Sequence, residues 1–197
     1  MPSDLKDIEV PDVPMSPSDF EDLRHKPAAQ VAYRASYPSC YGPYGLVAPV
    51  YQKNLQEYRN LYYRLQEAVD QPVDLVRTAI TDNAATDTVI VRTSDHGELL
   101  GSHGGLHQKW FQLYDESTRV PFSISRIGSQ PTSQRSVSSP TSHVDLVPTL
   151  LSAAGIDEQA TADELRSSFS EVHPLTGRNL MPLVDGAEED QRRSVYI

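Results

Sequence analysis

Cysteine is nearly absent from this sequence, because Cys40 is the only one among 197 residues. A single cysteine can form neither an internal disulfide nor a zinc site built from several thiolates. Basic residues are also scarce, since 17 lysines and arginines are outnumbered by 27 aspartates and glutamates. The resulting net charge of -10 repels the phosphate backbone of DNA or RNA. We therefore expect no nucleic-acid partner.

Long apolar runs are missing as well. No stretch approaches the roughly 20 residues that a membrane-spanning helix requires. The N-terminus begins MPSDLKDIEV, without the basic and then apolar segments of a secretory signal. Hydrophobic residues make up 38% of the chain, and the mean hydropathy is -0.46. These properties predict a soluble, cytoplasmic chain with no membrane partner, large enough for one domain or for part of a larger one.

Proline is unevenly distributed, since residues 1–50 hold eight of the 15 prolines and few periodic apolar positions. This composition predicts an extended or looping arm with little regular structure. Its tyrosines lie among prolines and glycines, at positions 33, 37, 41 and 44. Two interpretations stay open for them: they line a substrate pocket, or they pack on the surface of a domain.

The pattern becomes periodic after the arm. Apolar residues recur every three or four positions between Tyr51 and Val69, as on one face of a helix. Pro72 interrupts this pattern, and we expect helical structure to resume beyond a kink and continue to Ile80. A polar turn over residues 81–87 leads to the β-branched run of residues 88–93, which predicts a buried strand.

The remaining elements alternate in the same way. Residues 119–125 predict a second strand, and residues 126–142 form a connection rich in serine, proline and glutamine. A helix should begin after Asp145 as N-cap and end at Gly155. A polar helix is a candidate over residues 161–169. This order of helices and strands predicts an α/β protein, whose ligands bind beyond the carboxyl ends of the strands.

The loop that follows the first strand carries most of the candidate chemistry. Residues 93–110 read TSDHGELLGSHGGLHQKW and contain three of the six histidines. Asp95 and His96 offer a carboxylate and an imidazole to a divalent cation such as calcium, magnesium or manganese. Two ligands are too few for a tight site, so others must come from elsewhere. Alternatively, Asp95 simply caps a turn.

Three other polar residues of this loop have two interpretations each. Beside a metal, Lys109 would neutralise the charge of a sulfate or phosphate ester, but it could equally be a solvated surface lysine. His103 and His107 could be acid–base groups, anion contacts or ordinary polar loop residues.

Residues 88–122, TVIVRTSDHGELLGSHGGLHQKWFQLYDESTRVPF, resemble the second signature block of the sulfatase family, within the alkaline phosphatase superfamily. SHVDLVPTLLSAAGI at 142–156 and LTGRNLMPLVDG at 175–186 resemble later segments of that family, in the same order. The resemblance implies a partial alkaline-phosphatase-like mixed sheet flanked by helices, with the N-terminal strands missing. It implies a proline- and tyrosine-rich arm over 1–50, a carboxyl-terminal part of the catalytic domain over 51–186, and a tail over 187–197.

The resemblance also implies roles for residues of the loop. Asp95 and His96 match the family's second pair of metal ligands, for which calcium is expected and magnesium or manganese are alternatives. Lys109 matches the lysine that contacts the sulfate, and His103 matches a histidine common near that pocket, so both are candidate catalytic residues. His107 has no assigned role. The implied substrate is a small-molecule or glycan sulfate ester.

One part of the family's chemistry is missing. Its nucleophile lies in a Cys/Ser-x-Pro-x-Arg motif and is converted to formylglycine. The nearest matches, Ser36-Tyr-Pro-Ser-Cys40 and Cys40-Tyr-Gly-Pro-Tyr44, both lack the arginine, and we interpret them as coincidental. We therefore expect an incomplete sulfatase chain, inactive alone and completed by a separate N-terminal half. The alternatives are a phosphate or phosphonate ester hydrolase of the same superfamily and a non-catalytic binding remnant.

Overall fold

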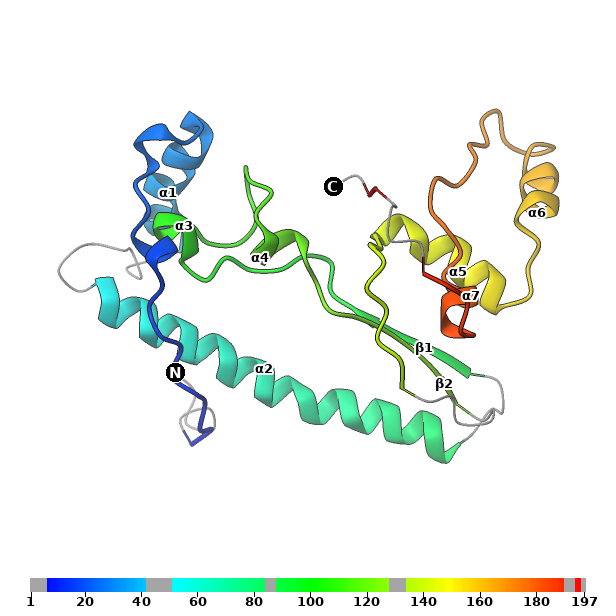
Figure 1. The fold of residues 1–197 in the computed structure, drawn as a ribbon, viewed down its shortest axis with the longest axis horizontal. Coiled ribbons are helices and arrows are strands. Elements are labelled where there is room, and N and C mark those ends of the chain that lie inside the picture. The colour runs from blue at the N-terminus through cyan, green and yellow to red at the C-terminus, as the bar shows by residue number, and fades with distance from the viewer. Residues whose placement is uncertain (1–6, 42–50, 84–87, 128–133, 190–193, 196–197) are drawn as a thin grey trace. The chain divides into compact units, whose positions relative to one another are not determined.

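The computed structural model describes residues 7–41, 51–83, 88–127, 134–189 and 194–195 (Figure 1). Its elements, in chain order, are the 3-10 helices η2 (Pro17–Phe20) and η3 (Leu23–His25), α1 (Ala28–Tyr41), α2 (Tyr51–Asp82), β1 (Thr88–Thr93), α3 (Ser102–Gly105), α4 (Asp115–Thr118), β2 (Phe122–Ile127), the 3-10 helix η4 (His143–Asp145), α5 (Leu146–Ala153), α6 (Glu158–Leu165) and α7 (Met181–Val184). Within the described residues, β1 pairs with β2 in a two-stranded sheet. The chain thus mixes helices and strands, as its sequence predicts.

The chain divides into two compact units. The first comprises residues 1–86 and 91–123, and the second comprises residues 87–90 and 124–197. The segments that resemble the sulfatase family therefore fall into both units, with the histidine-rich loop in the first. Parts of four predicted segments lie outside the described residues: the arm at 1–50, the turn at 81–87, the connection at 126–142 and the tail at 187–197. The predicted domain boundaries at residues 50 and 186 stay predictions.

Helix α1 corrects the prediction of an arm with little regular structure. The prolines of the arm lie mostly before residue 28, whereas residues 28–37 contain neither proline nor glycine. Alanine, glutamine and arginine in this stretch favour a helix. Pro27 lies just before it, where the absence of a backbone N–H is tolerated, and its carbonyl accepts the Gln30 N–H at 2.9 Å. Averaging the composition over 50 residues concealed this helix.

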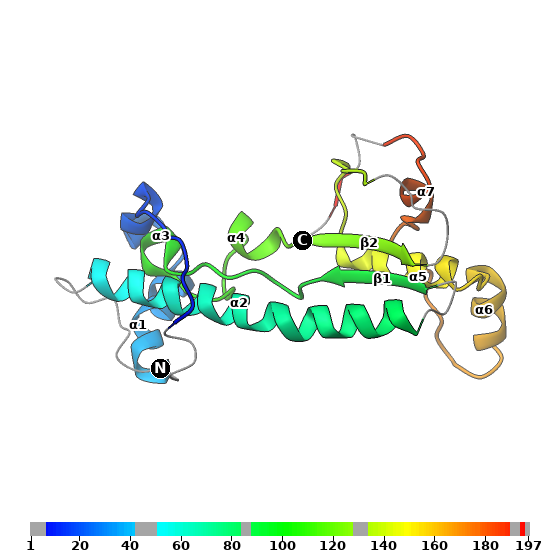
Figure 2. The same ribbon diagram turned by 90° about the horizontal axis from the view of Figure 1, so that it is seen from below.

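Helix α2 runs without a break from Tyr51 to Asp82, as Figure 2 also shows. The predicted helix is confirmed, and the predicted interruption at Pro72 is wrong. A proline within a helix removes one N–H and frees the carbonyl four residues before it, here that of Ala68. Because Pro72 is exposed, that carbonyl lies on a side of the helix that water can reach.

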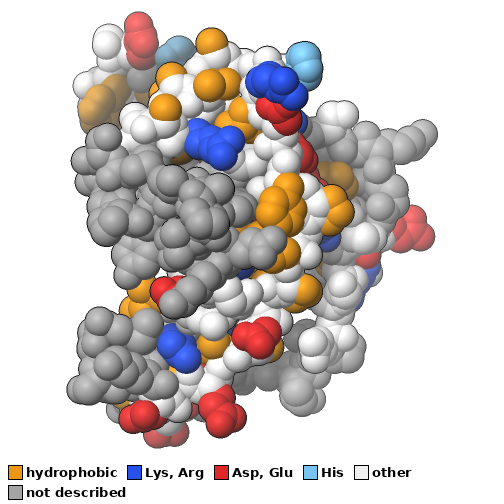
Figure 3. Space-filling model, turned by 90° about the vertical axis from the view of Figure 1, so that its left-hand side faces the viewer, with side chains coloured by type: hydrophobic (Ala, Val, Ile, Leu, Met, Phe, Trp, Pro, Cys, Tyr) orange, Lys and Arg blue, Asp and Glu red, His pale blue; other side chains and the backbone are white. Residues whose placement is uncertain are grey.

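The apolar stripe of α2 is buried at only one end. Leu55 is fully buried and Arg59 nearly so, whereas Leu65, Val69 and Val76 are exposed. The core of this unit consists of Leu23, Leu99 and Leu106, with two tyrosines, Tyr33 and Tyr114, packed against it. It therefore joins the N-terminal segment to the histidine-rich loop, and α3 lies beside η2 (Figure 1). Hydrophobic side chains also reach the surface on the face drawn in Figure 3.

Both predicted strands are present. β1 has the predicted bounds but is half-buried to exposed rather than buried, and β2 begins at Phe122 rather than at Arg119. Pro121 precedes β2 directly and has no N–H to donate, so regular pairing begins after it. No helix of the described residues has the length and apolar character needed to cross a membrane. The cytoplasmic location stays a prediction.

In the second unit, Asp145 and Thr149 link the two later family-like segments. The buried Asp145 carboxylate accepts the N–H of Ser142 at 2.9 Å and that of Arg178 at 2.7 Å. The buried Thr149 hydroxyl accepts the Leu180 N–H at 2.9 Å. A Cβ at Gly177 would lie 1.8 Å from the Val144 carbonyl oxygen, so only glycine fits there. These two segments therefore serve the packing of this unit.

The helix predictions in the second unit are largely confirmed. Asp145 is the N-cap residue of α5, and Gly155 follows the helix with a φ of +69°. The polar helix α6 begins at Glu158, earlier than predicted, because the Asp157 side chain accepts the Ala160 N–H at 2.7 Å and caps it.

Candidate functional site

The candidate site begins at the carboxyl end of β1, where the backbone turns and contacts α4. Gly97 makes this turn possible: its N–H donates to the Ser117 carbonyl at 2.8 Å, and a Cβ on it would lie 2.0 Å from the Glu116 carbonyl oxygen. No other residue fits this close approach. The turn places the side chains of Asp95 and His96 together immediately beyond the strand.

The contacts of His96 determine which ring nitrogen is available to a ligand. Nδ1 lies 2.8 Å from the Gly97 carbonyl oxygen, which can only accept, so Nδ1 carries the proton in the neutral ring. Nε2 then keeps its lone pair. This atom lies 3.3 Å from Asp95 Oδ2 and contacts Lys109 Nζ. The lone pair of His96 Nε2 and the Asp95 Oδ2 oxygen therefore lie side by side.

The Asp95 carboxylate is 82% exposed. The His96 backbone N–H, which donates to Asp95 Oδ1 at 2.9 Å, lowers the pKa of this carboxyl group, and the His96 ring adds to the effect. Asp95 is therefore charged at neutral pH. Asp95 could still act either as a turn cap or as a metal ligand, as predicted. Its Oδ1 accepts the His96 N–H, and this hydrogen bond does not use Oδ2.

The spacing of these two donor atoms fits a shared divalent cation. Two ligands at right angles, each about 2.3 Å from an ion, lie about 3.3 Å apart, which is the separation of His96 Nε2 and Asp95 Oδ2. Over the described ranges, however, no three His, Cys, Asp or Glu side chains come together to hold a metal. The metal assignment of Asp95 and His96 stays a prediction.

Lys109 lies at the other end of the loop, and its ammonium returns to the site. Nζ contacts His96 Nε2 on one side and lies 5.9 Å from the centre of the Trp110 ring on the other. The structure therefore brings together three of the four residues expected at the site: Asp95, His96 and Lys109. A cationic group stands beside the pair that could hold a metal.

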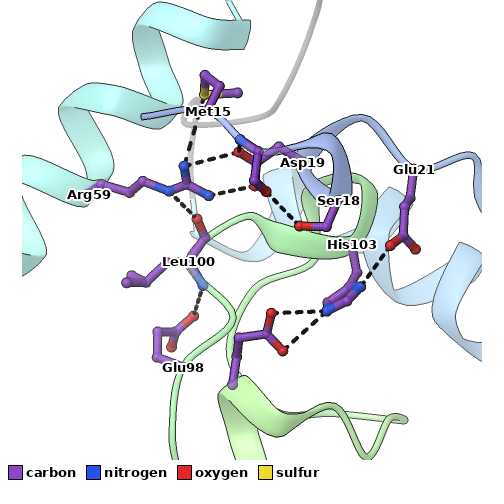
Figure 4. Close-up of polar contacts among 10 residues, drawn as sticks. Met15, Ser18, Asp19, Glu21, Arg59, Glu98, Leu100 and His103 are labelled. Atoms are coloured by element: carbon purple, nitrogen blue, oxygen red, sulfur yellow. Dashed lines mark hydrogen bonds and ion pairs between the residues drawn. The ribbon is translucent and has the colours of Figure 1, made fainter. Parts of the chain in front are cut away.

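His103, the fourth residue, has different partners. Its Nδ1 lies 3.1 Å from a Glu21 carboxylate oxygen, and its Nε2 lies 3.1 Å from one of Glu116. Its ring stacks on Tyr114, with 3.6 Å between the ring centres. Within the described part of the chain, no hydrogen bond or ion pair joins His103 to Lys109. Figure 4 shows His103 beside Glu21 and away from Arg59. These contacts favour a structural role, and its predicted catalytic role stays untested.

Two further residues fix the loop and were not predicted from the sequence. The guanidinium of Arg59 binds both carboxylate oxygens of Asp19, at 2.6 and 3.1 Å, and donates through Nε to the Leu100 carbonyl at 3.1 Å (Figure 4). Glu98 accepts the N–H groups of Leu100 and Gln108, at 3.2 and 2.5 Å. An arginine on the apolar stripe of α2 signals a buried ion pair, but nothing in the sequence selects Asp19 as its partner.

His107 belongs to the core rather than to the site. It is 2% exposed, and its ring meets that of Tyr58 edge to face, with 5.0 Å between their centres. Burial lowers the pKa of His107 to about 4, and the charge of Arg59 adds to this effect. The ring is therefore neutral at physiological pH. It lies too deep to contact a substrate in this loop conformation.

The first near match to a nucleophile motif, residues 36–40, lies in α1, and the second extends beyond the described residues. The Ser36 hydroxyl donates to the Tyr33 carbonyl at 2.9 Å within the helix. The Cys40 side chain and Tyr44 lie outside the described residues. The interpretation of both matches as coincidental stays a prediction.

Comparison with known proteins connects this loop to one family. Residues 22–156 match the family model described as Sulfatase. The chain is 33% identical over 138 residues to the uncharacterized sulfatase YidJ of Escherichia coli, covering 70% of this chain and 25% of that protein. It is also 33% identical over 146 residues to the choline-sulfatase of Rhizobium meliloti, covering 72% of this chain and 25% of the relative.

A solved structure has a similar fold. It is BT4656 in complex with its substrate D-glucosamine-2-N,6-O-disulfate, with a TM-score of 0.57 and 26% identity, over 77% of this chain and 27% of that one. The sequence thus spans about a quarter of the length of each of these relatives.

Proposed function

Because the chain belongs to the sulfatase family, we propose that it forms part of a hydrolase of sulfate monoesters. In this proposal the loop from Asp95 to Lys109 binds the sulfate group. The observation that carries it is the contact of the Lys109 ammonium with His96 Nε2, next to the Asp95 carboxylate. This arrangement pairs a fixed positive charge with two donors for a cation, which is what an oxyanion and its counter-ion require.

Asp95 and His96 would hold a divalent cation, with calcium as the expected ion and magnesium or manganese as alternatives. Carboxylate oxygen suits all three, and the imidazole suits manganese best. When bound, such an ion polarises the sulfate and neutralises part of its charge. The chain itself contributes the orientation: Gly97 O holds the His96 ring, and the His96 N–H holds the Asp95 carboxylate.

Lys109 would contact the sulfate oxygens. Its ammonium is a compact charge on a flexible stem, and the loop holds its backbone through Gln108, whose N–H donates to Glu98. A positive charge at this position stabilises the negative charge that develops on the sulfate oxygens as the ester bond breaks. His103, enclosed by Glu21 and Glu116, would support the loop rather than transfer a proton.

The sequence contains no complete Cys/Ser-x-Pro-x-Arg motif. We therefore assign the formylglycine nucleophile and the first pair of metal ligands to a further segment, such as a separate N-terminal half. The same segment would supply the remaining strands of an alkaline-phosphatase-like mixed sheet, to which β1 and β2 would belong. In this proposal the chain is inactive by itself. Two similar proteins are named for choline sulfate hydrolysis and for a disulfated glucosamine substrate, so the substrate is a small-molecule or glycan sulfate ester.

The test is hydrolysis of chromogenic esters by the chain alone and by the chain co-expressed with the N-terminal half of a motif-bearing relative. The proposal predicts turnover of p-nitrophenyl sulfate only in the combined protein. Lys109→Ala should lower kcat about 10²- to 10³-fold, and Asp95→Ala should abolish turnover. Arg166→Ala, which removes an exposed charge far along the sequence, is the matched control and should change nothing.

Three results would overturn this proposal. Faster hydrolysis of p-nitrophenyl phosphate than of the sulfate would assign the loop to phosphate esters. Sulfate binding without turnover in the combined protein would indicate a binding remnant. Turnover by the chain alone, lost in Ser36→Ala or Cys40→Ala, would show that a near-match motif is the nucleophile.

A further inference from the structure

Two aromatic side chains follow Lys109 directly and remain exposed. Trp110 is 50% exposed and Phe111 is 60% exposed. Aromatic side chains of this size usually lose most of their surface to packing, so an adjacent exposed pair calls for an explanation. Lys109 Nζ lies 5.9 Å from the centre of the Trp110 ring. An anion held by Lys109 would therefore have an indole face beside it.

The protein holds this pair in place through a constrained backbone. Gln108 and Phe111 have φ angles of +56° and +60°, which residues with side chains seldom adopt. Gln30 of α1 donates its amide N–H to the Phe111 carbonyl at 3.1 Å. The ring of Tyr33, also in α1, meets the Phe111 ring edge to face, with 5.8 Å between centres. Helix α1 thus fixes the backbone in a conformation that leaves both side chains about half exposed. The two rings lie with 6.4 Å between their centres and are tilted by 43° to each other, so together they form a shallow, angled surface.

Gln108 orients the indole and keeps hydrogen-bonding capacity of its own. Its side-chain oxygen accepts the Trp110 Nε1–H at 3.1 Å and the Tyr33 hydroxyl at 3.4 Å. Its side-chain nitrogen makes no hydrogen bond to any other described residue. An amide N–H₂ is therefore available at the edge of the Trp110 ring.

We infer that Trp110 and Phe111 form a platform for the ring of a sulfated sugar, whose sulfate is held by Lys109. This inference rests on the proposed function and adds the substrate class. A sugar ring has a flat face of C–H groups that packs on an aromatic ring, and hydroxyl groups at its rim that can accept from the Gln108 amide. A quaternary ammonium ester such as choline sulfate is disfavoured, because Lys109 already places a positive charge over the indole.

The test uses the fluorescence of Trp110, which is the only tryptophan in the chain. N-acetylglucosamine 6-sulfate, whose amide carries no charge, should change its emission with a Kd of about 1 mM. Unsulfated N-acetylglucosamine, inorganic sulfate and choline sulfate should each bind at least about tenfold more weakly, because each lacks one of the two contacts or brings a repelled charge. Phenyl sulfate distinguishes an aryl ring from a sugar ring.

Three variants and one control sharpen the result. Lys109→Ala and Phe111→Ala should each weaken binding of N-acetylglucosamine 6-sulfate about tenfold. Gln108→Leu should weaken it for the sugar and leave phenyl sulfate unchanged. Phe169→Ala removes an equally exposed phenylalanine of the other unit and should have no effect. Unchanged thermal unfolding midpoints would show that the variants are folded.

Two results would overturn the inference. No response to any ester, or equal affinity for the sugar and phenyl sulfates with no effect of Gln108→Leu, would exclude a sugar platform. The same measurements distinguish failure of this inference from failure of the proposed function. Sugar binding without Lys109-dependent hydrolysis would refute the hydrolase and support the platform. Lys109-dependent hydrolysis without sugar binding would support the hydrolase and refute the platform.

Discussion

His96 and His103 lie in the same loop, each beside acidic groups, but their surroundings differ. The acidic neighbour of His96 is the adjacent Asp95, and Nε2 also contacts the ammonium of Lys109. His103 is enclosed by carboxylates from distant parts of the chain, Glu21 and Glu116, and by the ring of Tyr114. Both rings therefore have protein partners at both nitrogens, but those of His96 all come from the same loop, and Nε2 meets two polar side chains of that loop.

The comparison shows that residue type does not decide the role of a loop histidine. A histidine joined to remote segments stabilises the tertiary structure, because removing it breaks contacts that hold those segments together. A histidine whose partners all lie within its own loop, as those of His96 do, should add less to stability. The loop therefore has a structural part, tied to η2, α2 and α4, and a second part, formed by Asp95, His96 and Lys109, that we propose to face the ligand.

The largest expected effect comes from breaking the structural part at Arg59. Arg59→Ala would leave the buried Asp19 carboxylate without its cationic partner, although the Ser16 N–H still donates to it, and would free the Leu100 carbonyl. We expect a loss of about 3–5 kcal/mol in the free energy of unfolding, measured by urea denaturation. Arg24→Ala breaks the exposed pair with Asp22 and is the control, expected to leave the midpoint unchanged. Equal effects of both variants would show that the buried pair does not hold the loop.

The next effect is a loss of stability in acid, caused by His107. Its pKa is about 4 in the folded chain, below its ordinary value of 6.5. Between these values the unfolded state binds a proton that the folded state excludes. The stability from the neutral ring is thus complete above pH 6.5 and falls with pH down to about 4, by about 3 kcal/mol.

Urea denaturation of the wild type and His107→Leu across this pH range measures the effect of His107. His107→Leu should flatten the decline, while His173→Leu, which replaces an exposed histidine, should not. An identical pH dependence in wild type and His107→Leu would contradict the burial of a neutral ring.

A smaller loss of stability compares His103 directly with His96. His103→Asn keeps a residue that tolerates the φ of +53° at this position but removes the stacked ring and both carboxylate contacts. We expect a loss of about 2 kcal/mol, measured by thermal unfolding. His96→Asn, the matched change in the ligand-facing part, should leave the unfolding midpoint nearly unchanged. The reverse order would invalidate the division of the loop.

The sequence predicts local features well and distant pairings poorly. The stripe of α2, the β-branched run of β1 and the start of α5 after Asp145 each depend on neighbouring residues, so their patterns are visible, whereas the contact of the Asp145 side chain with the Arg178 N–H is not. The meeting of Asp95, His96 and Lys109 was predicted through the family resemblance and the glycine-rich loop. The partners of Arg59 and His103 come from residues 19, 21 and 116, and one sequence without its fold cannot select them among 27 acidic residues. The helix over 28–41 was missed because the prolines that precede it dominate the composition.

The most direct test of the division is a calcium titration of the histidine-labelled chain, followed by nitrogen NMR of the imidazole rings. The account predicts that calcium shifts the Nε2 signal of His96, leaves the signals of His103 in place, and binds weakly, with a Kd of about 1 mM, because this loop supplies only two ligands. Asp95→Ala should abolish the shift. A shift of the His103 signals with His96 unchanged, or sub-micromolar binding that Asp95→Ala does not weaken, would contradict the account.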